Sequence, residues 1–214
     1  FRSYHSVVSR LREEQEQTQH AMEVQLATTE ALALAIEAKA GCTPEHIRSI
    51  QHYAAMLAEA FNLSDADVQA VRAAALLHDI GNMAVPEHIL AKADALTPEE
   101  FERVKIHPRV GADILRGVPF GGPVAELVLC HHERWDGLGY PAGLAGEDIP
   151  VGARILAIAD SFSTLQADRP YRPARTKADA LAVLQEFSGT AFDPELVDLF
   201  IARLKTASAA VAGL

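Results

Sequence analysis

The chain has 214 residues, 49% of them hydrophobic and 22% charged, which is ordinary for a globular protein with enough mass for one sizeable core. Its 19 basic and 29 acidic side chains give a net charge of −10, which argues against binding of nucleic-acid polymers or anionic membranes. Two cysteines, no signal-peptide pattern and no long apolar run predict a cytoplasmic chain without disulfides or membrane contact.

The first 40 residues contain neither proline nor glycine. Apolar side chains recur there at alternating steps of three and four residues, a heptad pattern that polar residues weaken in the middle. We predict a long N-terminal helix over 1–40 that signals or forms a homodimer through a marginal coiled coil. The alternative is a solvated chain end. Because Phe1 already lies inside this pattern, we expect the chain to be part of a longer polypeptide, such as the output domain of a sensor.

Residues 41–207 read as one further domain, a series of helices with local start signals. Thr43 followed by Pro44 predicts a helix that runs to about Phe61. Ser64 predicts the start of the next helix, which we expect to continue until Gly81. In both helices the histidines at 46 and 78 lie on the inward-facing stripe.

The second half of the chain continues in the same way. Thr97 predicts the start of a helix that Pro108 interrupts directly after His107. Glycines and prolines make 135–150 a structured loop. Further helices are expected from Pro123, over 151–168, and after the caps Thr176 and Asp193. Since no segment alternates as a strand does, the predicted fold class is all-α.

Five histidines and two aspartates interrupt apolar helical stretches, namely His46, His78, Asp79, His107, His131, His132 and Asp160. A lone histidine on an apolar stripe is usually a core residue, but an unpaired charge there costs several kcal/mol, so seven such groups predict metal coordination. Mixed imidazole and carboxylate ligands suit iron, manganese, zinc, cobalt or nickel better than calcium or magnesium. Seven ligands exceed one tetrahedral site, so two ions sharing a carboxylate account for them better.

The sequence resembles the HD-GYP family of phosphodiesterases, within the HD superfamily, over roughly residues 37–200. The resemblance rests on ordered blocks that include ALLHDIG at 75–81, HP and GA within 107–112, and HHERWDGLGYP at 131–141. It continues through ARILAIAD at 153–160, DRPYR at 168–172 and FDP at 192–194.

This resemblance implies an HD-superfamily helical bundle with two bound metal ions, iron or manganese in first place and zinc, nickel or cobalt as alternatives. It implies that Asp79 bridges the ions, that His46, His78 and Asp160 bind one ion, and that His107, His131 and His132 bind the other. A hydroxide shared between the ions would cut cyclic di-GMP to pGpG, and then to GMP. A third ion is not expected, because Cys42 stands where family members with three ions have Glu.

The resemblance also implies substrate contacts. Tyr140 and Pro141 would line the substrate site, although a plain turn is the alternative. Arg169 and Arg172 would bind phosphate oxygens, with Arg169 assisting catalysis, although surface salt bridges are the alternative.

Two positions depart from the family pattern. Asn82 stands where members usually have Lys, so a hydrogen-bond donor remains at this catalytic and substrate-binding position while a full charge is lost, and turnover should suffer. Ser163 stands where an acidic residue is usual, which either alters the substrate contacts or serves local packing.

These departures leave two functions open. The first is an active cyclic di-GMP phosphodiesterase. The second is a weakly active or inactive module that binds cyclic di-GMP or a diguanylate cyclase (GGDEF) partner and signals through its N-terminal helix. Hydrolysis of other cyclic dinucleotides also stays open.

Overall fold

The computed structural model describes residues 43–168 and 173–212, together with 15, 17, 24, 28, 30, 31 and 33–36. Most of the predicted helix over 1–40 therefore lies outside the described residues. The coiled-coil pairing and the domain boundary at residue 41 stay predictions.

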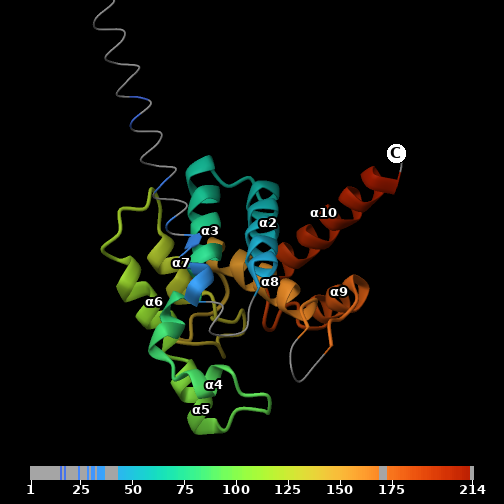
Figure 1. Ribbon diagram of the computed structural model, residues 1–214. Helices are drawn as coiled ribbons and strands as arrows, with labels where there is room; N and C mark the ends of the chain where they lie inside the picture. The colour runs from blue at the N-terminus through green and yellow to red at the C-terminus, as the bar shows by residue number, and fades with distance from the viewer. Residues whose placement is uncertain are drawn as a thin grey trace, which may run out of the picture.

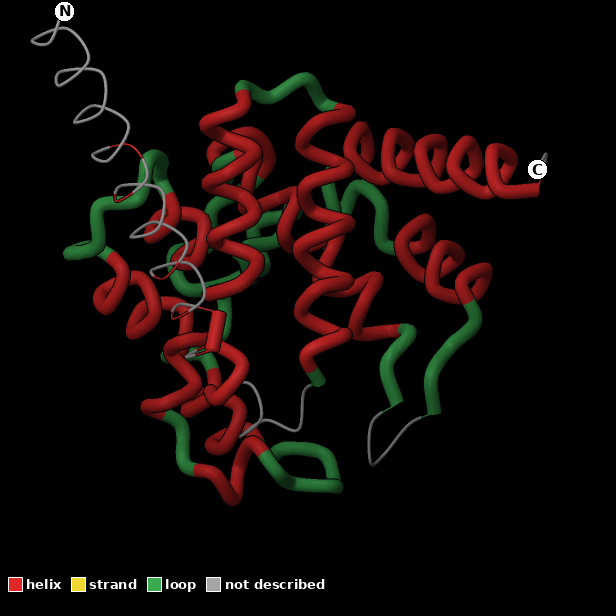
Figure 2. The backbone as a smooth tube through the Cα atoms, turned by 45° about the horizontal axis from the view of Figure 1, so that its top comes forward, coloured by secondary structure: helices red, strands yellow, loops and turns green. Residues whose placement is uncertain are grey.

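The described residues form helices and loops, and the only strand-like pairing among them is an isolated bridge between Ser188 and Phe192 (Figure 2). The predicted all-α class is confirmed. The α-helices are α2 (Pro44–Ala60), α3 (Asp65–Leu77), α4 (Glu87–Leu90), α5 (Pro98–Val104), α6 (His107–Leu115), α7 (Val124–Cys130), α8 (Val151–Leu165), α9 (Lys177–Glu186) and α10 (Pro194–Ala212). Two 3₁₀-helices are η1 (Ile80–Ala84) and η2 (Gly146–Asp148).

The predicted helix starts are confirmed by their caps. The side chains of Thr43, Ser64 and Thr176 each accept a hydrogen bond from a backbone N–H in the first turn of α2, α3 and α9. Thr97 and Glu100 form a reciprocal capping box at the start of α5. Each cap satisfies a donor that has no partner inside its helix, so the start of the helix is encoded locally.

Three predicted helix limits were wrong. The helix expected to reach Gly81 ends at Leu77, and η1 follows as a tighter turn. Pro108 does not break a helix but lies in the first turn of α6, where its missing N–H is not needed. The helix expected over 151–168 ends at Leu165, with Gln166 as its C-cap.

The core forms where α2 packs against α3 and α8, and α2 and α3 lie side by side (Figure 1). Tyr53 of α2, Phe162 of α8 and Phe200 of α10 meet edge-to-face, with ring centroids 5.0 to 5.8 Å apart. On another side of the bundle, α6 packs against α7 and η1. This packing brings together the end of α3, the start of α6 and the end of α7, where five of the seven predicted ligands lie: His78, Asp79, His107, His131 and His132.

None of the helices in the described part of the chain combines the length and apolar character needed to cross a membrane.

Candidate metal centre

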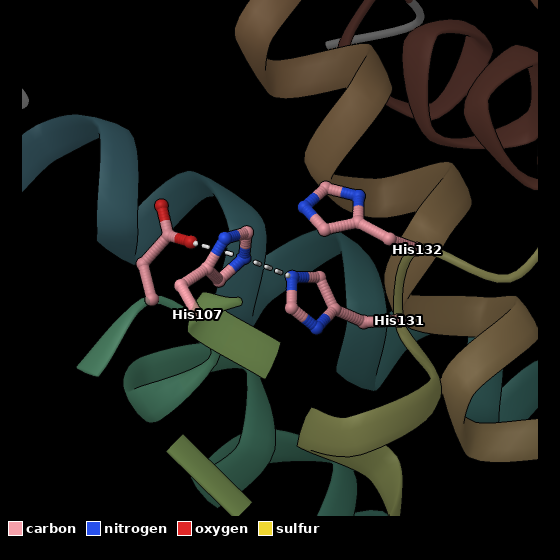
Figure 3. A group of neighbouring side chains, drawn as sticks. His107, His131 and His132 are labelled. Atoms are coloured by element: carbon pink, nitrogen blue, oxygen red, sulfur yellow. Dashed lines mark hydrogen bonds and ion pairs between the residues drawn. The ribbon is translucent and has the colours of Figure 1, made fainter. Parts of the chain in front are cut away.

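Four of the predicted ligands gather in one place. Asp79, His107, His131 and His132 each offer a ligand atom, and these atoms lie within 4.8 Å of one another. His107 Nε2 lies 3.3 Å from His131 Nε2 and 3.2 Å from Asp79 Oδ1. Figure 3 shows the rings of His107 and His131 facing each other, with His132 beside them. Such a cluster of nitrogens and a carboxylate matches the donor set of a transition-metal site.

Three of the histidines are oriented in the same way. The Nδ1 atom of each lies within hydrogen-bond distance of the carbonyl oxygen three residues earlier: His78 with Ala75 at 3.0 Å, His107 with Val104 at 2.8 Å, and His131 with Val128 at 2.6 Å. A carbonyl only accepts, so we assign the proton to Nδ1 and the lone pair to Nε2. This is the support that metal-binding histidines receive from the surrounding protein.

The assignment has an electrostatic consequence. With both protons on Nδ1, the Nε2 lone pairs of His107 and His131 face each other 3.3 Å apart, beside a carboxylate oxygen of Asp79. Lone pairs so arranged repel one another unless a cation lies between them. The residues therefore fit a bound metal ion.

Two histidines of this cluster, His131 and His132, are held neutral. Burial, with the neighbouring His132, His78 and His107, holds the pKa of His131 well below its ordinary value. Burial, followed by His107, lowers the pKa of His132 to about 4, although Asp160 and Asp79 act in the opposite direction. Neutral imidazole is the form that binds metal ions.

Two of the remaining predicted ligands, His78 and Asp160, adjoin this cluster. His78 Nε2 lies 3.6 Å from Asp79 Oδ2 and 4.0 Å from Asp160 Oδ1. Asp79 thus lies between two histidines: its Oδ1 atom is close to His107, and its Oδ2 atom is close to His78. The Asp160 carboxylate accepts a hydrogen bond of 3.1 Å from Thr164.

His46 contacts Ser163, which lies one turn after Asp160 on α8. Ser163 Oγ lies 3.0 Å from His46 Nδ1 and 3.4 Å from the His46 carbonyl oxygen. If the hydroxyl donates to the carbonyl, it accepts from Nδ1, which again leaves the lone pair on Nε2. Ser163, predicted to contact substrate, is buried here and contacts His46.

Tyr140 packs beside the metal cluster. Its ring centroid lies 4.9 Å from that of His132, and its backbone N–H donates a 3.2 Å hydrogen bond to the His132 carbonyl. Burial, together with the carboxylates of Asp79 and Asp160, raises the pKa of the Tyr140 phenol above its ordinary value. The hydroxyl therefore stays protonated at neutral pH. Pro141 follows through a cis peptide bond.

Glu133 has a role that the sequence interpretation did not assign. Its carboxylate is buried and accepts hydrogen bonds from the backbone N–H groups of Ala142 (2.7 Å), Gly143 (3.2 Å) and Leu144 (3.1 Å). Because Glu133 directly follows His132, it ties the loop after Pro141 to the metal cluster. The signal in the sequence is an acidic residue directly after two histidines, and it names no partner.

Asn82 is buried, and its Oδ1 atom has no hydrogen-bond partner among the described residues. A buried, unsatisfied carbonyl oxygen is costly and is often found at functional sites. Arg169 and Arg172 lie outside the described residues, so their phosphate contacts stay predictions.

Comparisons with known proteins identify the family of this chain. Residues 19–196 match the HD domain family. A cyclic di-GMP phosphodiesterase response regulator, RpfG, from Xanthomonas campestris is 43% identical over 176 residues, which cover 81% of this chain and 47% of that protein. A 3'3'-cGAMP-specific phosphodiesterase 2 from Vibrio cholerae is 37% identical over 172 residues, covering 79% of this chain and 33% of that protein.

A solved structure has the same fold. It is a cyclic GMP-AMP specific phosphodiesterase from Vibrio cholerae, V-cGAP3, with a TM-score of 0.63, 22% identity, and coverage of 83% of this chain and 48% of that one. The chain spans about half or less of the length of these relatives. The resemblance noted in the sequence and the predicted helical bundle are confirmed, and the chain belongs to the HD domain family.

Proposed function

We propose that this chain is a metal-dependent phosphodiesterase domain that hydrolyses cyclic di-GMP to pGpG. One observation carries the proposal: His107 Nε2 lies 3.3 Å from His131 Nε2 and 3.2 Å from Asp79 Oδ1, within a cluster of four possible ligand atoms. The relatives named as cyclic dinucleotide phosphodiesterases support the reaction class.

The proposed ligand set contains two groups that share Asp79. His107, His131 and His132 would hold one divalent transition-metal ion, and His46, His78 and Asp160 would hold the other. When bound, such ions lower the pKa of an attacking water molecule and neutralise charge on the phosphate. Iron and manganese are proposed first, and zinc, nickel or cobalt would also suit these ligands.

The protein's own contribution is orientation. The carbonyl groups of Ala75, Val104 and Val128 hold three imidazoles in one tautomer before any ligand arrives. Tyr140 lies against His132 and presents a protonated hydroxyl, which is a donor for a phosphate or sugar oxygen. Tyr140 and Pro141 would form one wall of the substrate site.

The decisive experiment removes the shared ligand. The variant Asp79→Ala should lose most of the bound metal and at least about a thousandfold of the hydrolysis rate, because both ions would lose a ligand. Asp113→Ala, which removes an exposed carboxylate of α6, is the matched control and should change neither. Metal content is measured after anaerobic purification with iron or manganese, and products are separated by chromatography. Intact metal content and hydrolysis in Asp79→Ala would refute the assignment.

The substrate and product are tested in the same assay. Cyclic di-GMP and 3',3'-cGAMP are supplied separately, because relatives named for each of them match this chain. Faster hydrolysis of cyclic di-GMP, with pGpG appearing before any GMP, is the expected result. Faster hydrolysis of cGAMP would show that the proposed substrate is wrong, while the proposed reaction class would stand.

Asn82 favours a second candidate function, a module that binds cyclic di-GMP or a GGDEF partner with little turnover. The lysine expected from the family pattern is absent at position 82, and the buried Asn82 Oδ1 atom has no hydrogen-bond partner within the described part of the chain. Calorimetry that shows binding while chromatography shows no pGpG would select this alternative. Homodimerisation through the N-terminal helix and a cytoplasmic location stay predictions.

A further inference from the structure

Lys105 follows the end of α5, two residues before His107, and its positive charge lies over two aromatic rings. Its Nζ atom lies 5.0 Å from the ring centroid of Phe101 and 5.7 Å from that of Tyr140. The Tyr140 ring in turn lies 4.9 Å from the ring of His132. One aromatic ring therefore separates the ammonium group from a proposed metal ligand.

The ammonium group can be reached by a ligand. Its ion pair with Glu102, at 2.6 Å, joins side chains that are 31% and 68% exposed. Ion pairs between exposed side chains contribute little stability, so a more strongly charged partner can replace Glu102. Phe101, which packs edge-on to Tyr140, is itself 43% exposed. An aromatic surface with a cation on it thus borders the site at Tyr140.

The substrate proposed above carries two phosphates in one ring. While one of them reacts at the metal centre, the ring closure keeps the second nearby. Asn82, buried in η1, is neutral and supplies no charge to this second phosphate. A cation that a ligand can reach at the border of the site, such as the Lys105 ammonium group, can form a charge-assisted hydrogen bond with this second phosphate.

We infer that Lys105 binds the phosphate of the cyclic dinucleotide that is not being cleaved, an inference that rests on the proposed function. Because this phosphate is equally charged in the bound substrate and in the transition state, Lys105 lowers KM and leaves kcat almost unchanged. It is a substrate-binding residue, and it leaves the bond-breaking step to the metal centre.

The test compares two phosphodiesters. Lys105→Met should raise the KM for cyclic di-GMP at least about fivefold with little change in kcat. It should leave the hydrolysis of bis(p-nitrophenyl) phosphate unchanged, because this compound has no second phosphate. Lys105→Arg should restore most of the affinity. Lys92→Met is the matched control, since Lys92 also pairs with a glutamate of α5 at 2.6 Å and has a similar exposure of 28%. Lys92→Met should change neither the KM for cyclic di-GMP nor the hydrolysis of bis(p-nitrophenyl) phosphate.

Each other result has a defined meaning. An unchanged KM for cyclic di-GMP in Lys105→Met overturns the inference, while the proposed function stands on the wild-type activity. If Lys105→Met loses the same factor of activity with cyclic di-GMP and with bis(p-nitrophenyl) phosphate, the inference is also overturned. Lys105 would then act through the fold or the metal centre. If the wild type shows no hydrolysis of cyclic di-GMP, calorimetry measures the dissociation constant of cyclic di-GMP instead. Lys105→Met should then raise this constant at least about fivefold. A wild type that neither binds nor cuts cyclic di-GMP rejects both proposals.

Discussion

Gly81 of η1 lies directly against the carbonyl group of His107, at the start of α6, and the contact leaves no room for a β-carbon at position 81. The same added atom would lie 2.7 Å from the backbone nitrogen of Gly111. This close approach of two backbones sets how near Asp79, two residues before Gly81, comes to His107.

Gly81→Ala should therefore separate the two segments. We expect a loss of roughly 1 to 3 kcal/mol in the free energy of unfolding, because the added carbon overlaps backbone atoms that cannot turn aside. Metal content should fall with it, since His107 would move away from Asp79. Denaturant unfolding and metal analysis measure both effects. Gly121→Ala is the control, because a β-carbon there meets open space. Equal stability of the two variants would contradict the prediction.

Glu133→Gln should loosen the loop that carries Tyr140. The amide replaces one carboxylate oxygen with an NH₂ group, which faces the backbone N–H donors of 142–144 and leaves at least one of them unsatisfied. We expect a destabilisation of about 1 to 3 kcal/mol and a higher KM for cyclic di-GMP. Glu126→Gln, on the exposed face of α7, should leave both values as in the wild type. A Glu133→Gln protein with unchanged stability and KM would show that these hydrogen bonds do not hold the loop.

Asn82→Lys should raise turnover of cyclic di-GMP by about tenfold, which corresponds to roughly 1.4 kcal/mol of transition-state stabilisation from the added charge. Asn82→Met serves as the matched variant, because the methionine side chain is similar in length to lysine and carries no charge. Both proteins are compared at full metal loading, with thermal melts to check folding, because residue 82 is only 5% exposed. If Lys gives no gain over Met, the missing charge does not limit the rate.

The metal-free protein should lose stability on acidification. The pKa values of His131 and His132 are depressed in the folded state, so the unfolded chain binds protons first as the pH falls below about 6.5. The free energy of unfolding should therefore fall below that pH. For His132, with its pKa of about 4, the loss amounts to about 2 kcal/mol by pH 5 and ends near pH 4.

Urea unfolding of chelator-treated protein at several pH values measures this slope. His132→Asn should show a shallower dependence between pH 6.5 and about 5, because one of the two histidines no longer takes up a proton on unfolding. An unfolding free energy that stays constant or rises over this range would contradict the prediction.

Much of the fold could be predicted because its signals are local. Thr43, Ser64, Thr97 and Thr176 each begin a helix by accepting hydrogen bonds from residues three positions later, so neighbouring residues suffice to identify them. The end of α3 at Leu77 could not be predicted in this way, since Gly81 adopts its position against α6, a helix that begins 26 residues further along the chain.

The residue types and their inward-facing positions on helices came from the amino-acid sequence by itself, and with them the candidate ligands and the HD family. Only the tertiary structure decided that His107 and His131 face each other beside Asp79, and that Glu133 binds the loop at 142–144. The physical reason is range. Helix caps and apolar stripes depend on residues within one or two turns, whereas distances between ligands depend on how whole helices pack.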